Sequence, residues 1–352
     1  MTVAVLAVTF EFLKNQDFWI NVGVLATTYG VFALGVQLNI GTTGIFNFGQ
    51  AGFMAVGSYT MGILVVKSGV SFWLALLAGL GTAAAAAILV GLPSLRLRAD
   101  YFAISTLAFS EIVRYIADNW DGLTGGNLGL FGYTDTWNDL STRIDGWLGH
   151  VGIAPHFLLP LLVVNLAVFL VLAAFVAVLV RSPWGRVLNA IREDEDAARA
   201  LGKNTFAYKL QSLSIAAALA AISGYMLAIN ISILSPANFD PVITAYGYVI
   251  VILGGLGSYL GVVVGSFFLI FLLTLGVLGS GIAVVYARQQ HRQAYVELTR
   301  LQKQRDEINI EFSRLQLEQA TWSEPNRIEQ VATERLGMQF PEAADVVVLQ
   351  SR

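Results

Sequence analysis

Long apolar runs, each separated by short polar stretches, occupy most of the chain. A helix rises about 1.5 Å per residue, so about twenty apolar residues cross the hydrocarbon core of a bilayer. Together with the mixed segment 100–114, this pattern predicts an all-α, polytopic helical membrane protein of about eight spans. The runs lie at 19–38, 54–66, 72–92, 156–180, 210–231 and 242–286, and the last is long enough for two crossings.

Composition supports a membrane protein and excludes several other classes. Hydrophobic residues make up 56% of the chain and charged residues 13%, against about 25% charged in soluble domains. With no cysteine, disulfides and thiolate metal sites are excluded, and a net charge of −3 argues against a nucleic-acid partner. We find no metal-ligand spacing and no catalytic triad, and predict no catalytic residue, metal or cofactor. Residues 2–10 lack a basic flank, so we predict no cleaved signal peptide.

Two loops of opposite charge character set the expected orientation. The stretch 181–209 carries six Arg or Lys against four acids, so it should face the cytoplasm, whereas 118–155 carries five Asp and one Arg and should lie outside. Gly202 supplies a helix stop. The apolar positions of the basic loop fall at helical spacing, which predicts one short amphipathic helix on the cytoplasmic face: Val187, Ala190, Ile191, Ala198 and Leu201.

Glycines alternate with amide side chains between 39 and 53. Irregular backbone at membrane depth must be buried in protein or line a cavity, so this stretch predicts a re-entrant or broken segment beside a polar pathway. The amides Asn39, Asn47 and Gln50 are the candidate lining residues. The alternative is that the glycines allow close helix packing and the amides bond between helices.

An ionisable pair interrupts the apolar segment 100–114. Glu111 and Arg114 lie three residues apart, on one helix face. Ionisable groups at membrane depth are commonly functional, which makes Glu111 a fourth candidate of the pathway. A structural pair near the helix end, with Arg114 reaching outward, is an equal alternative.

Five ordered motifs across about 17–272 resemble the LivM-type branched-chain amino-acid permeases of ABC importers: NIGxxGxxNxGQAxFM from Asn39, LRLRxDYFAIxTLAFxEIxR from Leu95, TGG from Thr124, WGRxLxAIRE with AAxxLG from Trp184, and GGLGS from Gly254. The resemblance implies that 181–209 docks into a separate ATPase. No G-x-x-x-x-G-K-[ST] sequence occurs, so a partner must hydrolyse ATP. The implied coupling residues are Arg186, Arg192, Asp196, Ala197, Ala198 and Gly202.

The same resemblance implies two further partners, a second permease subunit and an extracytoplasmic amino-acid-binding protein. The acidic, aromatic stretch 118–155 is the candidate dock for the binding protein. Alternatively its aromatic residues form an interfacial belt in the lipid bilayer, the commoner use of Trp and Tyr. These aromatics are Trp120, Phe131, Tyr133, Trp137 and Trp147.

A coiled-coil pattern replaces the apolar runs after residue 287. Residues at alternating spacings of three and four form an apolar d seam and an a seam that alternates polar and apolar, which favours a weak homodimer completed by a different partner helix. Beyond it, Ser323 and Gly337 bound a short helix, and 346–349 is β-prone. The predicted partner interface consists of Leu298, Leu301, Ile308, Phe312, Leu315 and Trp322.

This tail resembles the cell-division protein FtsL in its last span, its coiled coil, the run LEQATW ending at Trp322, the run ATERLGM ending at Met338, and the closing VVVLQ. The resemblance implies an extracytoplasmic, periplasmic coiled coil that pairs with FtsB and joins FtsQ at the division septum.

The two resemblances meet near Leu272 without a linker. We therefore predict a permease domain at 1–272 that lacks its C-terminal segment, a last span at 273–287, a coiled coil at 288–322 and a small helix with a β-prone end at 323–352. A natural fusion, a chimera and an engineered joining share this pattern, and the missing linker favours a chimera. The leading hypothesis is a non-enzymatic amino-acid permease of the bacterial inner membrane. The alternatives are a septal scaffold and a chain in which the junction abolishes both functions.

Overall fold

The computed structural model describes residues 15–150, 156–339 and 341. Over this part the chain is helical, without a strand, and its one isolated antiparallel bridge joins Leu130 and Leu234. The stretch 2–10 and the β-prone end 346–349 lie outside the described residues. The chain divides into two compact units, Met1–Gly279 and Ser280–Arg352, which are described separately.

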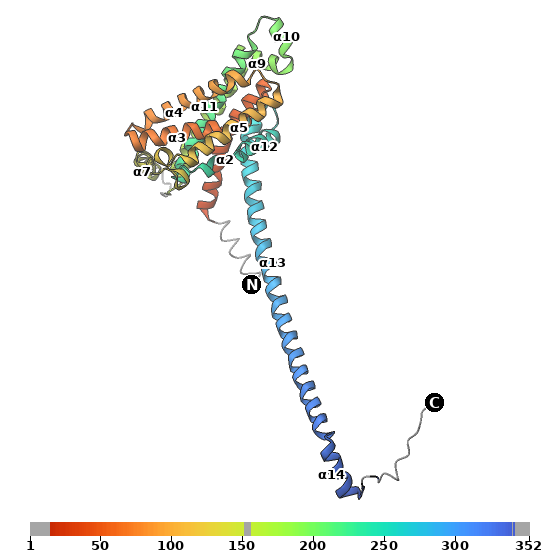
Figure 1. The fold of residues 1–352 in the computed structure, drawn as a ribbon. Helices are drawn as coiled ribbons and strands as arrows, with labels where there is room; N and C mark the ends of the chain where they lie inside the picture. Colours follow the sequence, from red (N-terminus) through yellow and green to blue (C-terminus); the bar gives the residue numbers. More distant parts are fainter. Residues whose placement is uncertain (1–14, 151–155, 340, 342–352) are drawn as a thin grey trace. The chain divides into compact units, whose positions relative to one another are not determined.

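The first unit is a bundle of long apolar helices with short helices in its loops (Figure 1). In chain order its elements are α2 (Gln16–Gln37), the π-helical turn η1 (Leu38–Thr43), α3 (Gln50–Ser68), α4 (Phe72–Ser94), α5 (Ala99–Asn119), α6 (Asp121–Thr124), η2 (Gly126–Leu128), α7 (Asp135–His150), α8 (Leu159–Arg181), α9 (Pro183–Glu193), α10 (Glu195–Ala200), α11 (Thr205–Ile231), η3 (Pro236–Phe239), α12 (Val242–Gly254) and the start of α13 (Tyr259–Trp322).

Seven helical stretches of the described residues are long and apolar enough to cross a membrane. They contain α2 with η1, α3, α4, α8, α11, η3 with α12, and the first part of α13. The expectation of about eight spans also counted α5, which has 21 residues but carries charged groups such as Asp100, Glu111 and Arg114. The molecule is a polytopic helical membrane protein, as the apolar pattern predicts.

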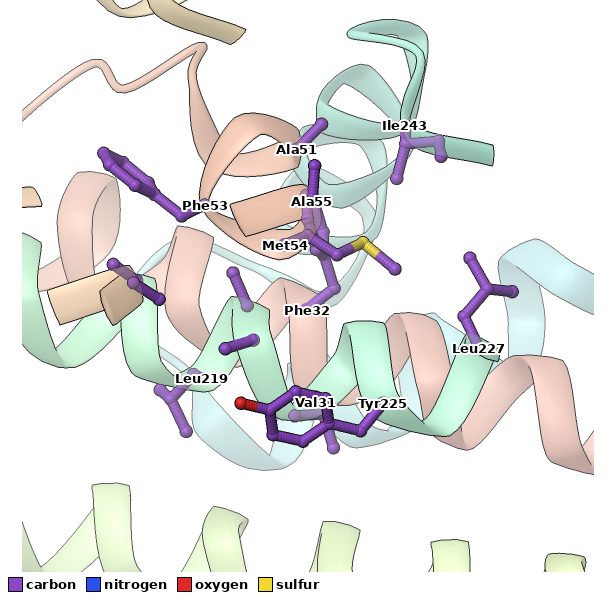
Figure 2. Close-up of a cluster of buried hydrophobic side chains, with 14 of the residues drawn as sticks. Val31, Phe32, Ala51, Phe53, Met54, Ala55, Leu219, Tyr225, Leu227 and Ile243 are labelled. Atoms are coloured by element: carbon purple, nitrogen blue, oxygen red, sulfur yellow. The ribbon is translucent and has the colours of Figure 1, made fainter. Parts of the chain in front are cut away.

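Helix α11 lies at the centre of the bundle and packs against α2, α3 and α4. Small residues allow this approach, since a Cβ on Gly224 would stand 2.1 Å from the Ser58 hydroxyl of α3. Figure 2 shows how side chains such as Phe32 of α2, Met54 of α3 and Leu219 of α11 gather into one cluster. In contrast, α4 and α8 leave most of their apolar surface outside the bundle, as helices that face lipid do.

The apolar stretch 242–286 turns at Gly255–Ser258. Helix α12 ends at Gly254, and Gly255 and Gly257 adopt φ angles of 93° and 88°, which glycine takes without steric cost. Helix α13 then begins at Tyr259 and continues for 64 residues. The predicted span 273–287 lies within this continuous helix, and its assignment as a separate span stays a prediction.

The stretch 118–155, which was predicted to lie outside, contains α7. Two of the aromatic residues of this stretch are not exposed, as a docking surface or an interfacial belt would require. Tyr133 and Trp137 are buried, and the Tyr133 hydroxyl donates to the Ala228 carbonyl oxygen at 2.9 Å. They are core residues, because each packs its ring against helices of the bundle, and they cannot form a dock or a lipid belt. Trp120, Phe131 and Trp147 remain exposed.

The second unit contains the rest of α13 and the helix α14 (Pro325–Leu336). A turn at Ser323 and Glu324 separates the two helices, Pro325 lies in the first turn of α14, and Gly337 ends it with φ 61°. The Arg327 guanidinium lies over the Trp322 ring, 4.1 Å from its centroid. The stop at Gly337 agrees with the expectation, but the expected cap is wrong by one residue: Glu324 occupies the N-cap, and the Ser323 hydroxyl donates back to the Gln319 carbonyl oxygen of α13 instead.

Candidate functional site

The first candidate site is the break between α2 and α3. After the π-helical turn η1, Gly44 adopts a left-handed φ of 75°, and the Ile45 N–H donates back to the Asn39 carbonyl oxygen at 2.9 Å. Backbone without regular secondary structure then leads to Gln50, where α3 begins. This confirms the predicted broken segment, and its polar side chains Asn39, Asn47 and Gln50 are all buried.

Two of the three amides form a connected network. Asn47 Nδ2 donates to Gln50 Oε1 at 2.9 Å, and Gln50 Nε2 donates to the Ala216 carbonyl oxygen of α11 at 2.8 Å. The Asn47 side-chain oxygen accepts from the Gly49 N–H, and its backbone oxygen accepts from the Tyr248 hydroxyl. The bonds at the Gly49 N–H and the Asn47 carbonyl satisfy backbone groups that the break removes from helical pairing, and Gln50 ties the segment to α11, so both amides hold the segment in place.

Hydroxyl groups from distant helices complete this support. Thr106 of α5 accepts from the Phe48 N–H at 3.1 Å, Thr244 of α12 accepts from the Ala51 N–H at 3.2 Å, and Ser212 of α11 bonds to Thr43 at 2.7 Å. None of these hydroxyls was expected from the sequence, because each lies in a different membrane-length or mixed segment, far along the chain from the break. Only the fold brings them to the break.

Asn39 differs from its neighbours. Its side chain is buried, yet neither its oxygen nor its nitrogen has a hydrogen-bond partner among the described residues. A buried amide without partners costs about 1–3 kcal/mol. Such a group is available to a polar ligand or to water that enters the bundle.

The break also contacts the turn before α13. The Gln37 amide is oriented with its oxygen towards this turn. The oxygen accepts hydrogen bonds from the N–H groups of Gly257 and Ser258, at 2.5 and 3.2 Å. The Thr42 hydroxyl bonds to the Tyr259 hydroxyl. The end of α2, the break and the start of α13 are therefore joined at one face of the bundle.

The charged loop touches this same place through one arginine. Arg192, near the end of α9, donates from Nη1 to the Gly41 carbonyl oxygen of η1. A Cβ on Gly44 would stand 2.9 Å from Arg192 Cγ, so the glycine permits the contact. Arg192 thus links the loop to the break.

The charged loop contains two helices where one was predicted. Asp194 has extended backbone between α9 and α10, and its carboxylate accepts from the Ala197 N–H at 2.9 Å as the N-cap of α10. The short polar side chain of Asp194 favours this cap over continued helix, which explains the difference. Gly202 follows α10 with φ 77°, in agreement with the predicted stop.

The six predicted coupling residues occupy different surroundings. Ala198 is buried against Leu188 and Ile191 and holds α10 onto α9. Arg192 binds η1, as described. The other four lie at the surface of the loop: Arg186, Asp196, Ala197 and Gly202.

An ion pair fixes α10 to the start of α11. Lys209 donates to Glu195 Oε2, and Arg199 donates to Glu195 Oε1 at 3.1 Å. Burial alone would raise the pKa of Glu195, but the hydrogen bond and charge of Lys209, with help from Thr205 and Arg199, outweigh it and lower this pKa below its ordinary value.

Glu111, the fourth pathway candidate, bonds to Arg114 on α5. Arg114 Nε and Nη2 both approach Glu111 Oε2, at 2.9 and 2.8 Å. The Glu111 side chain is 37% exposed and the Arg114 side chain is 27% exposed, so the ion pair is partly accessible from outside the bundle. This geometry is compatible with a residue of the substrate pathway and with a structural ion pair near the helix end. The role of Glu111 therefore stays a prediction.

The predicted seam of the tail lies exposed along α13. Leu298, Leu301, Ile308, Phe312, Leu315 and Trp322 each leave more than half of their surface uncovered. Exposed large apolar groups at heptad spacing are typical of a helix that buries this face against another helix. The described part of the chain offers these residues no covering element.

The bundle, the broken helix and the membrane-length spans define a polytopic helical membrane protein with a polar break in its core. Residues 18–295 match the family model described as "Branched-chain amino acid transport system / permease component", and residues 259–351 match the model "Cell division protein FtsL". The chain belongs to the branched-chain amino acid transport permease family and carries, fused at its end, a segment of the FtsL family. Helix α13 contains the overlap of the two matches, 259–295.

Individual relatives agree with this division. The LivM permease proteins of Salmonella typhimurium and Escherichia coli are 36% and 34% identical over 290 and 287 residues, which cover 77% of this chain and 66% of each relative. The chain therefore spans just under two thirds of the length of these relatives. The FtsL protein of Xanthomonas campestris pv. campestris is 58% identical over 73 residues, which cover 21% of this chain and 84% of that protein. No solved structure matches.

Proposed function

We propose that residues 18–295 act as the transmembrane permease subunit of an ABC importer for branched-chain amino acids in the bacterial inner membrane. The observation that carries the proposal is the bond from Arg192 of α9 to Gly41 of η1, because it connects the charged loop to a buried break in a membrane helix. A separate ATPase subunit hydrolyses ATP and moves the loop.

The coupling step follows from where the loop residues lie. The exposed residues Arg186, Asp196, Ala197 and Gly202 form the face that meets the ATPase. Ala198 keeps α10 on α9, so the two helices move together. Arg192 then carries the displacement to Gly41, where the π-helical turn and Gly44 allow the backbone to change.

The substrate passes beside the break as the two sides of the membrane are exposed in turn. Asn39 offers the free amide for the amino or carboxyl group of the substrate. Asn47 and Gln50 shape this wall through their network, and Glu111 lies on the neighbouring helix α5. On the outer side, the exposed aromatics Trp120, Phe131 and Trp147 receive the binding protein, and a second permease subunit completes the pathway.

The test is uptake of radiolabelled leucine by cells that lack their own permease and carry this chain with its ATPase and binding protein. Arg192→Gln should reduce uptake about tenfold or more, because a charge-assisted bond at the moving contact is lost. Arg300→Gln, which removes an arginine in the second unit, is the matched control and should retain uptake. Wild-type uptake by Arg192→Gln would contradict the coupling role.

A second function is favoured by the exposed seam of α13 and by the FtsL match. In this proposal the tail is periplasmic, pairs with FtsB, joins FtsQ at the septum, and uses the permease part as an anchor. Bacterial two-hybrid contact with these proteins should be lost with Leu301→Pro and Ile308→Pro, which break the helix at two d positions. Arg192→Gln should leave the contact intact.

An immunoblot with an antibody to the tail decides whether both functions belong to one polypeptide. A single 38.0 kDa band supports testing both activities on the intact chain. A band at the size of a lone division protein would show that two proteins act separately. An intact chain that fails both assays would show that the junction abolishes each function.

A further inference from the structure

A cavity of about 490 Å³ opens where the charged loop meets the break, and no step of the proposed transport uses it. Six parts of the first unit meet there: the end of η1 with the break that follows it, the turn between α4 and α5, the start of α5, the end of α9, helix α10, and the start of α11. It lies at the face that the basic loop assigns to the cytoplasm.

The charges of this cavity are strongly unbalanced. Glu195 is the acid in its lining, against five bases: Arg96, Arg98, Arg192, Arg199 and Lys209. Three of the bases are already engaged, since Lys209 and Arg199 bind Glu195, and Arg192 binds Gly41 and Glu193.

Arg96 and Arg98 are different. Neither has a carboxylate within ion-pair distance in the described part of the chain, and Arg96 lies over the Phe206 ring, 5.7 Å from its centroid. Arg98 precedes α5, a helix of 21 residues whose first N–H groups open beside it without a side-chain cap. Two guanidinium groups without a carboxylate partner and a helix N-terminus together suit a phosphate, which accepts paired hydrogen bonds.

The apolar surroundings indicate where this phosphate comes from. Below the arginines, α4 exposes Leu89 and Leu92, and α5 exposes Tyr101 and Ile104. These exposed side chains suit contact with acyl chains, and the lining of the cavity itself includes two exposed apolar residues, Phe46 and Leu97. Basic pockets at the cytoplasmic ends of membrane helices are typical sites of anionic lipid headgroups.

We propose that this cavity binds the phosphate of an anionic phospholipid of the cytoplasmic leaflet, with Arg96 and Arg98 as its principal ligands and Arg192 at its inner wall. Because Arg192 also binds Gly41, a bound headgroup adds negative charge beside the contact that joins the loop to the break. The lipid therefore stabilises the arrangement of α9, α10 and η1 shown here. This site is independent of whether the chain transports amino acids.

The test measures thermal unfolding of the purified full chain in detergent with added phosphatidylglycerol, phosphatidylcholine or inorganic phosphate. Phosphatidylglycerol should raise the unfolding midpoint, and phosphatidylcholine should not. Arg96→Gln with Arg98→Gln should weaken the apparent affinity for phosphatidylglycerol about tenfold or more. Arg181→Gln with Lys203→Gln removes the same charge from the loop outside the cavity and should leave the affinity unchanged.

Each outcome decides the assignment. Equal binding by Arg96→Gln/Arg98→Gln and by the wild type would overturn it, and so would an equal loss in the loop control. Stabilisation by inorganic phosphate as strong as by phosphatidylglycerol would assign the cavity to a soluble anion. Arg96→Lys with Arg98→Lys guards against misfolding, because it keeps the charge and should bind more tightly than the glutamine pair.

Discussion

At the scale of single residues, two of the three amide side chains at the break have hydrogen-bond partners and the third has none. Gln50 connects Asn47 to the Ala216 carbonyl oxygen, whereas Asn39 has no partner among the described residues. Their sequence context is alike, since all stand among glycines in one short stretch. A structural role and a transport role can be distinguished by measuring both the unfolding midpoint and the leucine uptake of variants at these positions.

Replacing Gln50 tests the structural role. Gln50→Leu should lower the unfolding midpoint of the detergent-solubilised chain, because it leaves the Asn47 amide nitrogen buried without its partner, at about 1–3 kcal/mol, and removes the side-chain bond that ties the break to the Ala216 carbonyl oxygen of α11. Thr142→Ala, at an exposed position of α7, is the control and should leave the midpoint near that of the wild type. An unchanged midpoint in Gln50→Leu would show that the network carries no stability.

Asn39→Leu should give the opposite result. Removing a buried amide that has no partner should leave the unfolding midpoint unchanged or raise it, while leucine uptake falls about tenfold through loss of one bond to the substrate. Both quantities are measured on the same variant. A fall in the midpoint with normal uptake would show that Asn39 acts in folding only.

Glu195 predicts a pH dependence of the loop. Its pKa is lowered in the folded chain, so its contribution to stability is present above its ordinary pKa of 4.5 and is lost as pH falls through the lower folded value. Wild type should therefore lose stability in this acid range more steeply than Glu195→Gln, when unfolding midpoints are followed from pH 6 downward. Glu193→Gln is the neighbouring control. Parallel curves for wild type and Glu195→Gln would contradict the role of the Lys209 pair.

At the scale of elements, glycine conformation connects the break to the loop. Gly44 and Gly69 both have left-handed φ angles, 75° and 62°, but only a Cβ at Gly44 would meet Arg192. Gly44→Ala and Gly69→Ala should each cost about 1–2 kcal/mol of stability from the backbone alone. Gly44→Ala should also reduce leucine uptake, whereas Gly69→Ala should not. Equal uptake by both variants would show that this contact does not couple the loop.

Much of this element pattern could be predicted from hydropathy and charge. The long helices, the break after Leu38 and the stops at Gly202 and Gly337 all follow from local chemistry. The second helix of the loop could not be predicted from spacing, because the apolar positions continue through Asp194. The hydroxyls of Thr106, Ser212 and Thr244 were missed for another reason, since they reach the break only through packing between distant helices.

At the scale of the whole molecule, the direction of α13 decides whether one chain can serve both families. Its start lies at the Gln37 end of α2, through Gly257 and Ser258, at the face where Arg192 binds Gly41. Further along α13, Phe271 stacks on Trp19 near the other end of α2, with ring centroids 6.1 Å apart. Within the first unit, α13 therefore runs from the Gln37 end of α2 towards its Trp19 end. An extracytoplasmic coiled coil requires this direction if the loop is cytoplasmic.

The proposed periplasmic tail and cytoplasmic loop predict the side of the membrane from which each part can be labelled. The chain has no cysteine, so Ser323→Cys and Lys203→Cys each introduce a single thiol. A maleimide that does not cross membranes should modify Ser323→Cys in intact spheroplasts and Lys203→Cys only after permeabilisation, because the scaffold proposal needs a periplasmic tail and the basic loop is expected in the cytoplasm. Labelling of both thiols only after permeabilisation would place the tail in the cytoplasm. The seam of α13 would then lie on the wrong side of the membrane for a periplasmic partner, and the scaffold function would fail while the permease proposal could still hold.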